Sequence, residues 1–175
     1  MELLRTEILH PLTDVVLYAT IIDNSPAIRR VLIGSGARCD IAAAHVHRAA
    51  PELENAAWLM VSYLNGTDVD FSEIVSAPDN ETPFASAVLA AARTIRFGKT
   101  CSYSELACRA GYPAAVRAAA SVMRNNRLPL LVPCHRIVLK NGKPGAYNGD
   151  RAGDDAALKK KLLQMESFHL KQFDE

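Results

Sequence analysis

A turn-forming segment at residues 76–83 (SAPDNETP) divides the chain into two parts with different patterns of apolar residues. Segments rich in proline, polar and acidic residues are typical of domain boundaries. The 175 residues are enough for one large core or two small ones. We therefore predict a structural α/β domain over residues 1–78 and a second domain over residues 79–175.

The first part has the patterns of mixed helix and strand. Residues 14–22 (DVVLYATII) and 28–35 (IRRVLIGS) are rich in β-branched side chains and are separated by turn formers, which predicts a β-hairpin. Residues 51–66 (PELENAAWLMVSYLNG) begin with proline, carry apolar residues at helical spacing and end on Asn-Gly, which predicts a helix. Residues 69–75 (VDFSEIV) are expected to add a strand.

The second part is mainly helical in pattern. A helix over residues 83–95 follows a Thr82 cap, and a helix over residues 102–111 opens with the Ser-x-x-Glu of a capping box. Residues 114–126 (AAVRAAASVMRNN) predict a third helix. Two short helices joined by a turn that contains glycine are a candidate helix-turn-helix, although many small domains contain such a pair and bind no DNA.

Charge is divided unequally along the chain. Residues 1–91 hold 5 Lys/Arg against 12 Asp/Glu, whereas residues 92–175 hold 15 against 7, which gives net charges of −7 and +8. A basic half favours a face that binds a polyanion, and the alternative is two solvated surfaces that neutralise each other. The helix at residues 114–126 has little bulk besides Arg117 and Arg124, so it could enter a groove or simply pack closely on a neighbour.

The cysteines indicate the compartment. Cys39, Cys101, Cys108 and Cys134 are scattered and form no C-x-x-C pair, which argues against a disulfide scaffold and favours a reducing compartment. The spacing of Cys39 to the nearby histidines, His45 and His47, does not fit structural zinc, so we expect no metal and no cofactor.

No apolar run reaches 18 residues and the first residues lack a secretory pattern. We expect a cytoplasmic protein, or a nuclear one in a eukaryote, without membrane contact.

Cys134 lies near the end of a strand-like apolar run at residues 128–138 (LPLLVPCHRIV). A lone cysteine in such a run is usually a small buried hydrophobic residue. Here Pro133 fixes the backbone ahead of it, and His135 and Arg136 are expected to lower the pKa of the thiol. Asn126 could tie the loop back to the backbone. The combination indicates a positioned, activated nucleophile.

The stretches FGKTCSYSELA, RAAASVMRNNRLPLLV, PCHRIV and NGKPGAY resemble the O6-alkylguanine-DNA alkyltransferases, and the resemblance extends over residues 65–166. The first sixty-odd residues resemble only the variable N-terminal domain of that family, and weakly. The implied fold is α+β. A small RNase H-like α/β domain would precede a mainly helical domain with a winged helix-turn-helix-like motif.

The resemblance also implies a reaction. The chain would act as a monomer without an obligate protein partner. After flipping the base, it would irreversibly transfer the alkyl group of O6-alkylguanine in double-stranded DNA to Cys134, one lesion per chain, with O4-alkylthymine an open second substrate. His135 would act as base through a water, Glu166 would hold His135, Tyr103 would donate to the guanine ring, and Asn126 would be a hinge.

The resemblance assigns further residues to DNA and to the base. Arg117 would enter the base stack where the nucleotide left. The residues placed at the DNA are Arg117, Ala118, Ala119, Ser121, Arg124 and Arg136. Those placed around the extruded base are Met123, Pro129, Val132, Tyr147 and Asn148.

Two segments depart from the family pattern. Alanine stands where glycine is expected after Arg117, and residues 148–161 are longer and more acidic than expected, so Glu166 could instead be a solvated helix-end carboxylate. The three lysines at residues 159–161 could form a phosphate-facing patch or a solvated face, and we favour the solvated face. Two other functions stay open: a non-catalytic binder of alkylated DNA with the same fold, and a helix-turn-helix regulator in which Cys134 is buried or senses oxidants.

Overall fold

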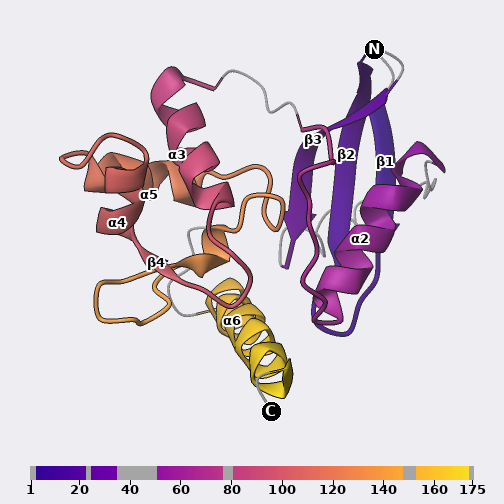
Figure 1. Cartoon of the computed structure of the whole chain (residues 1–175). Helices are drawn as coiled ribbons and strands as arrows, with labels where there is room; N and C mark the ends of the chain where they lie inside the picture. Colours follow the sequence, from indigo (N-terminus) through magenta and orange to yellow (C-terminus); the bar gives the residue numbers. More distant parts are fainter. Residues whose placement is uncertain (1–2, 23–24, 35–50, 77–80, 148–152, 174–175) are drawn as a thin grey trace. The chain divides into compact units, whose positions relative to one another are not determined.

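The structure is a computed structural model that describes residues 3–22, 25–34, 51–76, 81–147 and 153–173. It divides into two compact units, residues 1–79 and residues 80–175, and each is described by itself (Figure 1). Both combine helices with small sheets. Within the described residues, no helix is long and apolar enough to span a bilayer.

The first unit contains an antiparallel sheet in the order β1-β2-β3. The predicted hairpin is confirmed as β2 (Val15–Ile22) and β3 (Ser25–Ile33), with Val15 opposite Ile33. The strand β1 (Leu3–Ile8), which the sequence analysis did not identify, pairs with β2 and places Ile8 opposite Val15. Apolar residues of β2 and β3, such as Val15 and Ile33, are almost completely buried and form the core.

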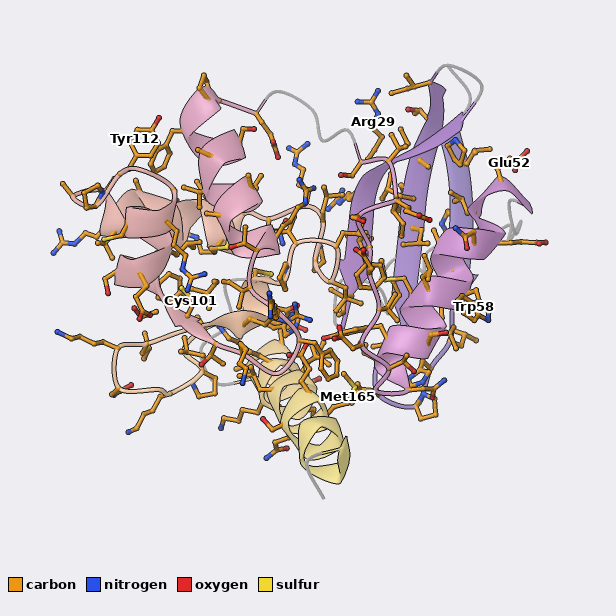
Figure 2. The ribbon with its side chains drawn as sticks, viewed as in Figure 1. Arg29, Glu52, Trp58, Cys101, Tyr112 and Met165 are labelled. Atoms are coloured by element: carbon orange, nitrogen blue, oxygen red, sulfur yellow. The ribbon has the colours of Figure 1, made fainter. Side chains whose placement is uncertain are left out.

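A helix packs beside this sheet. A 3-10 turn at Pro51–Leu53 leads into α2 (Glu54–Leu64), which confirms the helix expected over residues 51–66 (Figure 1). Met60 and Tyr63 are buried, whereas Trp58 projects from the helix and is 65% exposed (Figure 2). Burying a side chain such as Met60 stabilises the unit by about 1.5–3 kcal/mol.

The strand expected over residues 69–75 is wrong. The Asp70 carboxylate accepts a hydrogen bond from Ser72 N at 2.8 Å, and Ile74 N donates to Phe71 O at 3.1 Å, so the segment forms turns. A short aspartate side chain that bonds its own backbone competes with a strand ladder. Only the end of the segment joins the sheet, where Ile28 N donates to Val75 O.

The second unit confirms the three predicted helices, with shorter bounds. In α3 (Pro83–Arg93), Thr82 Oγ1 accepts from Ala85 N, and Pro83 occupies the first turn. A two-residue strand, β4 (Cys101–Ser102), precedes α4 (Tyr103–Arg109), which opens with the expected capping box. The turn contains Gly111 at φ +84° and leads to α5 (Val116–Arg124). The helices α3, α4 and α5 pack on one another.

The apolar run at residues 128–138 is not the strand that its composition suggests. Val132 N donates to Leu128 O across a tight turn in which Leu130 has φ +72°. A 3-10 helix (Cys134–Arg136) follows, and only β5 (Ile137–Val138) is a strand, parallel to β4. Pro129 and Pro133 explain the difference, because proline has no N–H to donate to a ladder. The last helix, α6 (Asp154–Phe173), contacts this 3-10 helix.

Candidate active site

Cys134 is the first residue of the 3-10 helix and faces a cavity of about 1120 Å³. Its side chain is 6% exposed, and its N–H donates to Val132 O at 2.8 Å. Tyr103 at the start of α4 and Arg117 on α5 line the same cavity, together with Tyr147. Residues that are distant in the sequence therefore meet around one thiol.

Asn126 ties the turn before Cys134 to the end of α5. Its Nδ2 donates to Val132 O at 3.1 Å and to Cys134 Sγ at 3.2 Å, and its Oδ1 accepts from Leu128 N at 2.9 Å. The side-chain amide thus replaces backbone pairing in a turn that contains a left-handed leucine. This geometry fits the expectation that Asn126 connects the helix with the cysteine segment.

The thiol of Cys134 is neutral at rest. Burial raises its pKa, and this effect exceeds the opposing contributions of a hydrogen bond from Asn126, the positive charge of Lys159 and a hydrogen bond from Tyr147. The expectation that His135 and Arg136 lower the thiol pKa is therefore corrected: the groups that favour the thiolate come from the turn after α5, from α6 and from the loop at Tyr147.

Glu166 on α6 holds three elements together. Its Oε1 lies 2.9 Å from His135 Nε2 and accepts from Arg136 NH2 at 2.9 Å. Its Oε2 accepts from Gly98 N at 2.9 Å, and Arg136 NH1 donates to Ile95 O at 2.6 Å. The Glu166 side chain is 1% exposed, so it is not a solvated helix-end carboxylate.

The charges in this cluster are matched. Burial alone would raise the pKa of Glu166, but the hydrogen bonds of His135 and Arg136 and the positive charge of Arg136 prevail and lower it to about 2. Burial lowers the pKa of His135, which makes the imidazole neutral at pH 7. Since ionised Glu166 can only accept, His135 carries its proton on Nε2, and Nδ1 can accept a proton.

Two residues placed at the DNA by resemblance lie elsewhere. The Arg136 side chain is 11% exposed and is engaged by Glu166 and Ile95, so its assignment to the DNA face is corrected. Ala119 is fully buried on the inner side of α5, four residues before the buried Met123. Helix periodicity could have identified Ala119, because positions 119 and 123 share one face.

None of the other α5 residues that the resemblance assigns to DNA is buried. Arg117 and Ala118 are exposed, and Arg117, Ser121 and Arg124 line the cavity of Cys134. Tyr112, in the turn before α5, also lies at the surface of this unit (Figure 2). Helix α5 therefore supplies the two arginines that line the cavity beside the thiol.

The expected pocket residues separate into three groups. Met123 and Tyr147 line the cavity. Pro129 and Val132 are buried and form a bridge with each other across the turn at Leu130, so they shape the cysteine segment without lining the cavity. Asn148 lies outside the described residues, as do Cys39, His45 and His47.

The sequence analysis missed Lys159, which is 1% exposed. Its Nζ donates to Ile137 O at 2.6 Å and lies 3.4 Å from Ala146 O and 6.0 Å from the Tyr147 ring centroid. Burial lowers its pKa to about 8, and a thiolate at Cys134 opposes the shift. The solvated-face interpretation is wrong for this lysine. Its spacing of seven residues from Glu166 on one helix was the available signal.

Replacement of Lys159 by methionine is expected to raise the pKa of Cys134, because a positive charge that favours the thiolate is removed. The pH dependence of Cys134 carbamidomethylation by iodoacetamide, followed on the peptide that contains Cys134, should then shift to higher pH. Lys159→Arg should restore much of the original profile, and the exposed Lys161→Met is the control. An unchanged profile in Lys159→Met would remove Lys159 from the electrostatics of the thiol.

The chain is similar to several known proteins. Residues 83–168 match the model of the 6-O-methylguanine DNA methyltransferase DNA-binding domain. A constitutive methylated-DNA–protein-cysteine methyltransferase of Bacillus subtilis is 34% identical over 126 residues, which cover 72% of this chain and 73% of that protein. A Methanothermobacter thermautotrophicus protein of the same name is 38% identical over 108 residues, 62% of this chain and 57% of that protein.

The fold has a close solved counterpart. A crystal structure of the Mycobacterium tuberculosis O6-methylguanine methyltransferase superposes with a TM-score of 0.74 at 23% identity and covers 98% of this chain and 99% of that one. This structural match includes residues of both units. The sequence match to the M. thermautotrophicus protein spans little more than half of that protein. Sequence similarity over nearly three quarters of the B. subtilis protein shows that this chain belongs to the methylated-DNA–protein-cysteine methyltransferase family.

Proposed function

We propose that the protein repairs DNA directly, by moving the alkyl group of O6-alkylguanine onto Sγ of Cys134. The observation that carries the proposal is the position of this thiol, at a cavity lined also by Tyr103 and Arg117 and supported by the Glu166 cluster. Membership of the family supports the reaction class. Double-stranded DNA is the partner, the chain acts as a monomer, and its compartment is the cytoplasm, or the nucleus in a eukaryote.

In the proposed reaction, sulfur attacks the alkyl carbon. An S–C bond forms while the C–O6 bond breaks, and the electron pair of that bond stays on the guanine. The thiol proton passes to His135 through a water molecule, and Tyr103 donates a proton to the departing guanine ring. Burial raises the pKa of Cys134, while Asn126, Lys159 and Tyr147 favour the thiolate that the proton transfer leaves. The thioether product is not hydrolysed, so one chain acts once.

The DNA-facing roles follow from α4 and α5, which we propose to be a winged helix-turn-helix-like motif, while the first unit is RNase H-like. The O6 atom lies within the duplex, so the nucleotide must be extruded at a cost of a few kcal/mol. Arg117, exposed beside the cavity, would fill the vacated place, and Ala118, Ser121 and Arg124 would face the groove. O4-alkylthymine stays an open second substrate under this proposal.

Lesion repair is expected to stop at one alkyl group per protein chain. The test mixes the protein with increasing amounts of a duplex containing O6-methylguanine and counts the repaired lesions by restriction cleavage or chromatography. Repair that reaches a plateau at equimolar lesion supports the proposal, and continued turnover would contradict it.

The variant Arg117→Ala should repair the duplex more slowly, whereas its reaction with a free O6-alkylguanine base should be slowed less.

A further inference from the structure

The three consecutive lysines of α6 lie in three different environments. Lys159 is buried, Lys160 is exposed and lines the cavity of Cys134, and Lys161 is exposed and lines neither of the two described cavities. Successive residues of an α-helix are rotated by about 100° around its axis, which explains the separation. Lys160 also borders a second cavity of about 510 Å³.

A second lysine reaches the same cavity from a different element. Lys143 lies in the turn after β5, where Leu139 N donates to Lys143 O at 2.9 Å and Gly142 N donates to Leu139 O at 2.8 Å. Asn141 Oδ1 accepts from Lys143 N at 3.1 Å, and Gly142 has φ +76°. Lys140, in the same turn, is exposed and does not line the cavity.

Lys159 joins these two elements. Its Nζ donates to Ile137 O and lies within hydrogen-bonding distance of Ala146 O, so α6 is bonded to both sides of the turn that carries Lys143. The hydrogen bonds of Lys159 therefore fix the backbone of Lys143 relative to the backbone of Lys160. Within the part of the chain that the structure describes, neither lysine forms an ion pair with a carboxylate.

We propose that Lys143 and Lys160, the rim lysines, bind the DNA phosphates that adjoin the extruded nucleotide. This inference rests on the proposed function, because a base that enters the cavity carries its own phosphates to the mouth. Arg117 and Arg124 supply positive charge on the α5 side, and the rim lysines supply it from the turn and from α6. The phosphates would thus meet cations contributed by three separate elements.

The first test compares two charge-matched double variants. Lys143→Gln with Lys160→Gln removes the rim lysines, and Lys140→Gln with Lys161→Gln removes two exposed lysines of the same turn and the same helix. Affinity for an O6-methylguanine duplex is measured by fluorescence anisotropy over a range of salt concentrations. The slope of log K against log salt should become less steep by about 2 in the rim variant, about 1 per lysine, and should stay unchanged in the control. Equal losses in both variants would overturn the proposal.

The second test locates the contact on the DNA. Methylphosphonate linkages replace the charged phosphates on either side of the lesion, and both duplexes are bound to each variant. Wild type and the control should lose affinity on this replacement, whereas the rim variant should lose much less. If the replacement lowers the affinity of the rim variant as much as that of the wild type, the rim lysines do not contact the phosphates beside the lesion. Both tests measure DNA binding and not methyl transfer. A wild-type protein that takes up no methyl group would therefore contradict the proposed function and leave the result for the rim lysines intact.

Discussion

Replacement of Cys134 by alanine is expected to abolish methyl transfer from an O6-methylguanine duplex while leaving binding of that duplex nearly unchanged. The reason is geometric. Among the described cysteines, Cys134 alone lines the cavity that holds Tyr103 and Arg117, while Cys101 is buried in β4 and Cys108 is exposed on α4. The residues proposed to face DNA lie on other elements, so binding does not need the sulfur.

Transfer of radiolabelled methyl groups from DNA to protein measures the reaction, and fluorescence anisotropy with the same duplex measures binding. Cys108→Ala is the matched control, because it removes an exposed thiol of the same unit. The control should transfer as the wild type does. Residual stoichiometric transfer by Cys134→Ala would show that another residue accepts the alkyl group.

Replacement of Glu166 by glutamine is expected to lower the free energy of unfolding by about 3–5 kcal/mol, the usual cost of leaving a buried charge without its partner. The carboxylate is 1% exposed and binds His135, Arg136 and Gly98 N. The amide would leave the Arg136 guanidinium inside the unit without a counter-charge. Urea denaturation of the wild type and of Glu166→Gln measures the difference. Glu73→Gln, at an exposed position, is the control and should change the free energy of unfolding little.

The same substitution should change the acid sensitivity of the protein. The pKa of Glu166 falls from 4.5 to about 2 on folding, so its contribution to stability is complete above about pH 4.5 and is lost as pH falls towards 2. The shift corresponds to about 3 kcal/mol. Glu166→Gln should therefore show a flatter dependence of stability on pH between about 4.5 and 2. An equally steep dependence in wild type and variant would contradict the buried ion pair.

Local patterns were sufficient to predict several helices and one hairpin. The Thr82 cap, the Ser102–Glu105 capping box and the β-branched runs of β2 and β3 act over a few residues, and the structure contains each of them. The apolar run before Cys134 misled the prediction, since composition favours a strand while two prolines prevent a ladder. The strand β1 was missed because its alternation is short and close to the chain start.

The site was predicted less completely, because its electrostatics depend on contacts between distant residues. The sequence places His135 and Arg136 beside Cys134, yet both face Glu166, 31 and 30 residues away in the sequence. The cations and donors that favour the thiolate are Lys159, Tyr147 and Asn126, brought to Cys134 by the packing of α6 and two turns. Within the run of three lysines nothing marks the first as buried, and only its spacing of seven residues from Glu166 indicates a shared helix face.

A peptide map after reaction with an O6-methylguanine duplex tests the central claim most directly. Trypsin cleaves after Arg127 and Arg136, so residues 128–136 form a peptide in which Cys134 is the single cysteine, while Cys101 and Cys108 share the peptide of residues 100–109. The account predicts one added methyl group per chain, on the peptide of residues 128–136. A methyl group on residues 100–109, or an unmodified chain after incubation with excess lesion, would contradict it.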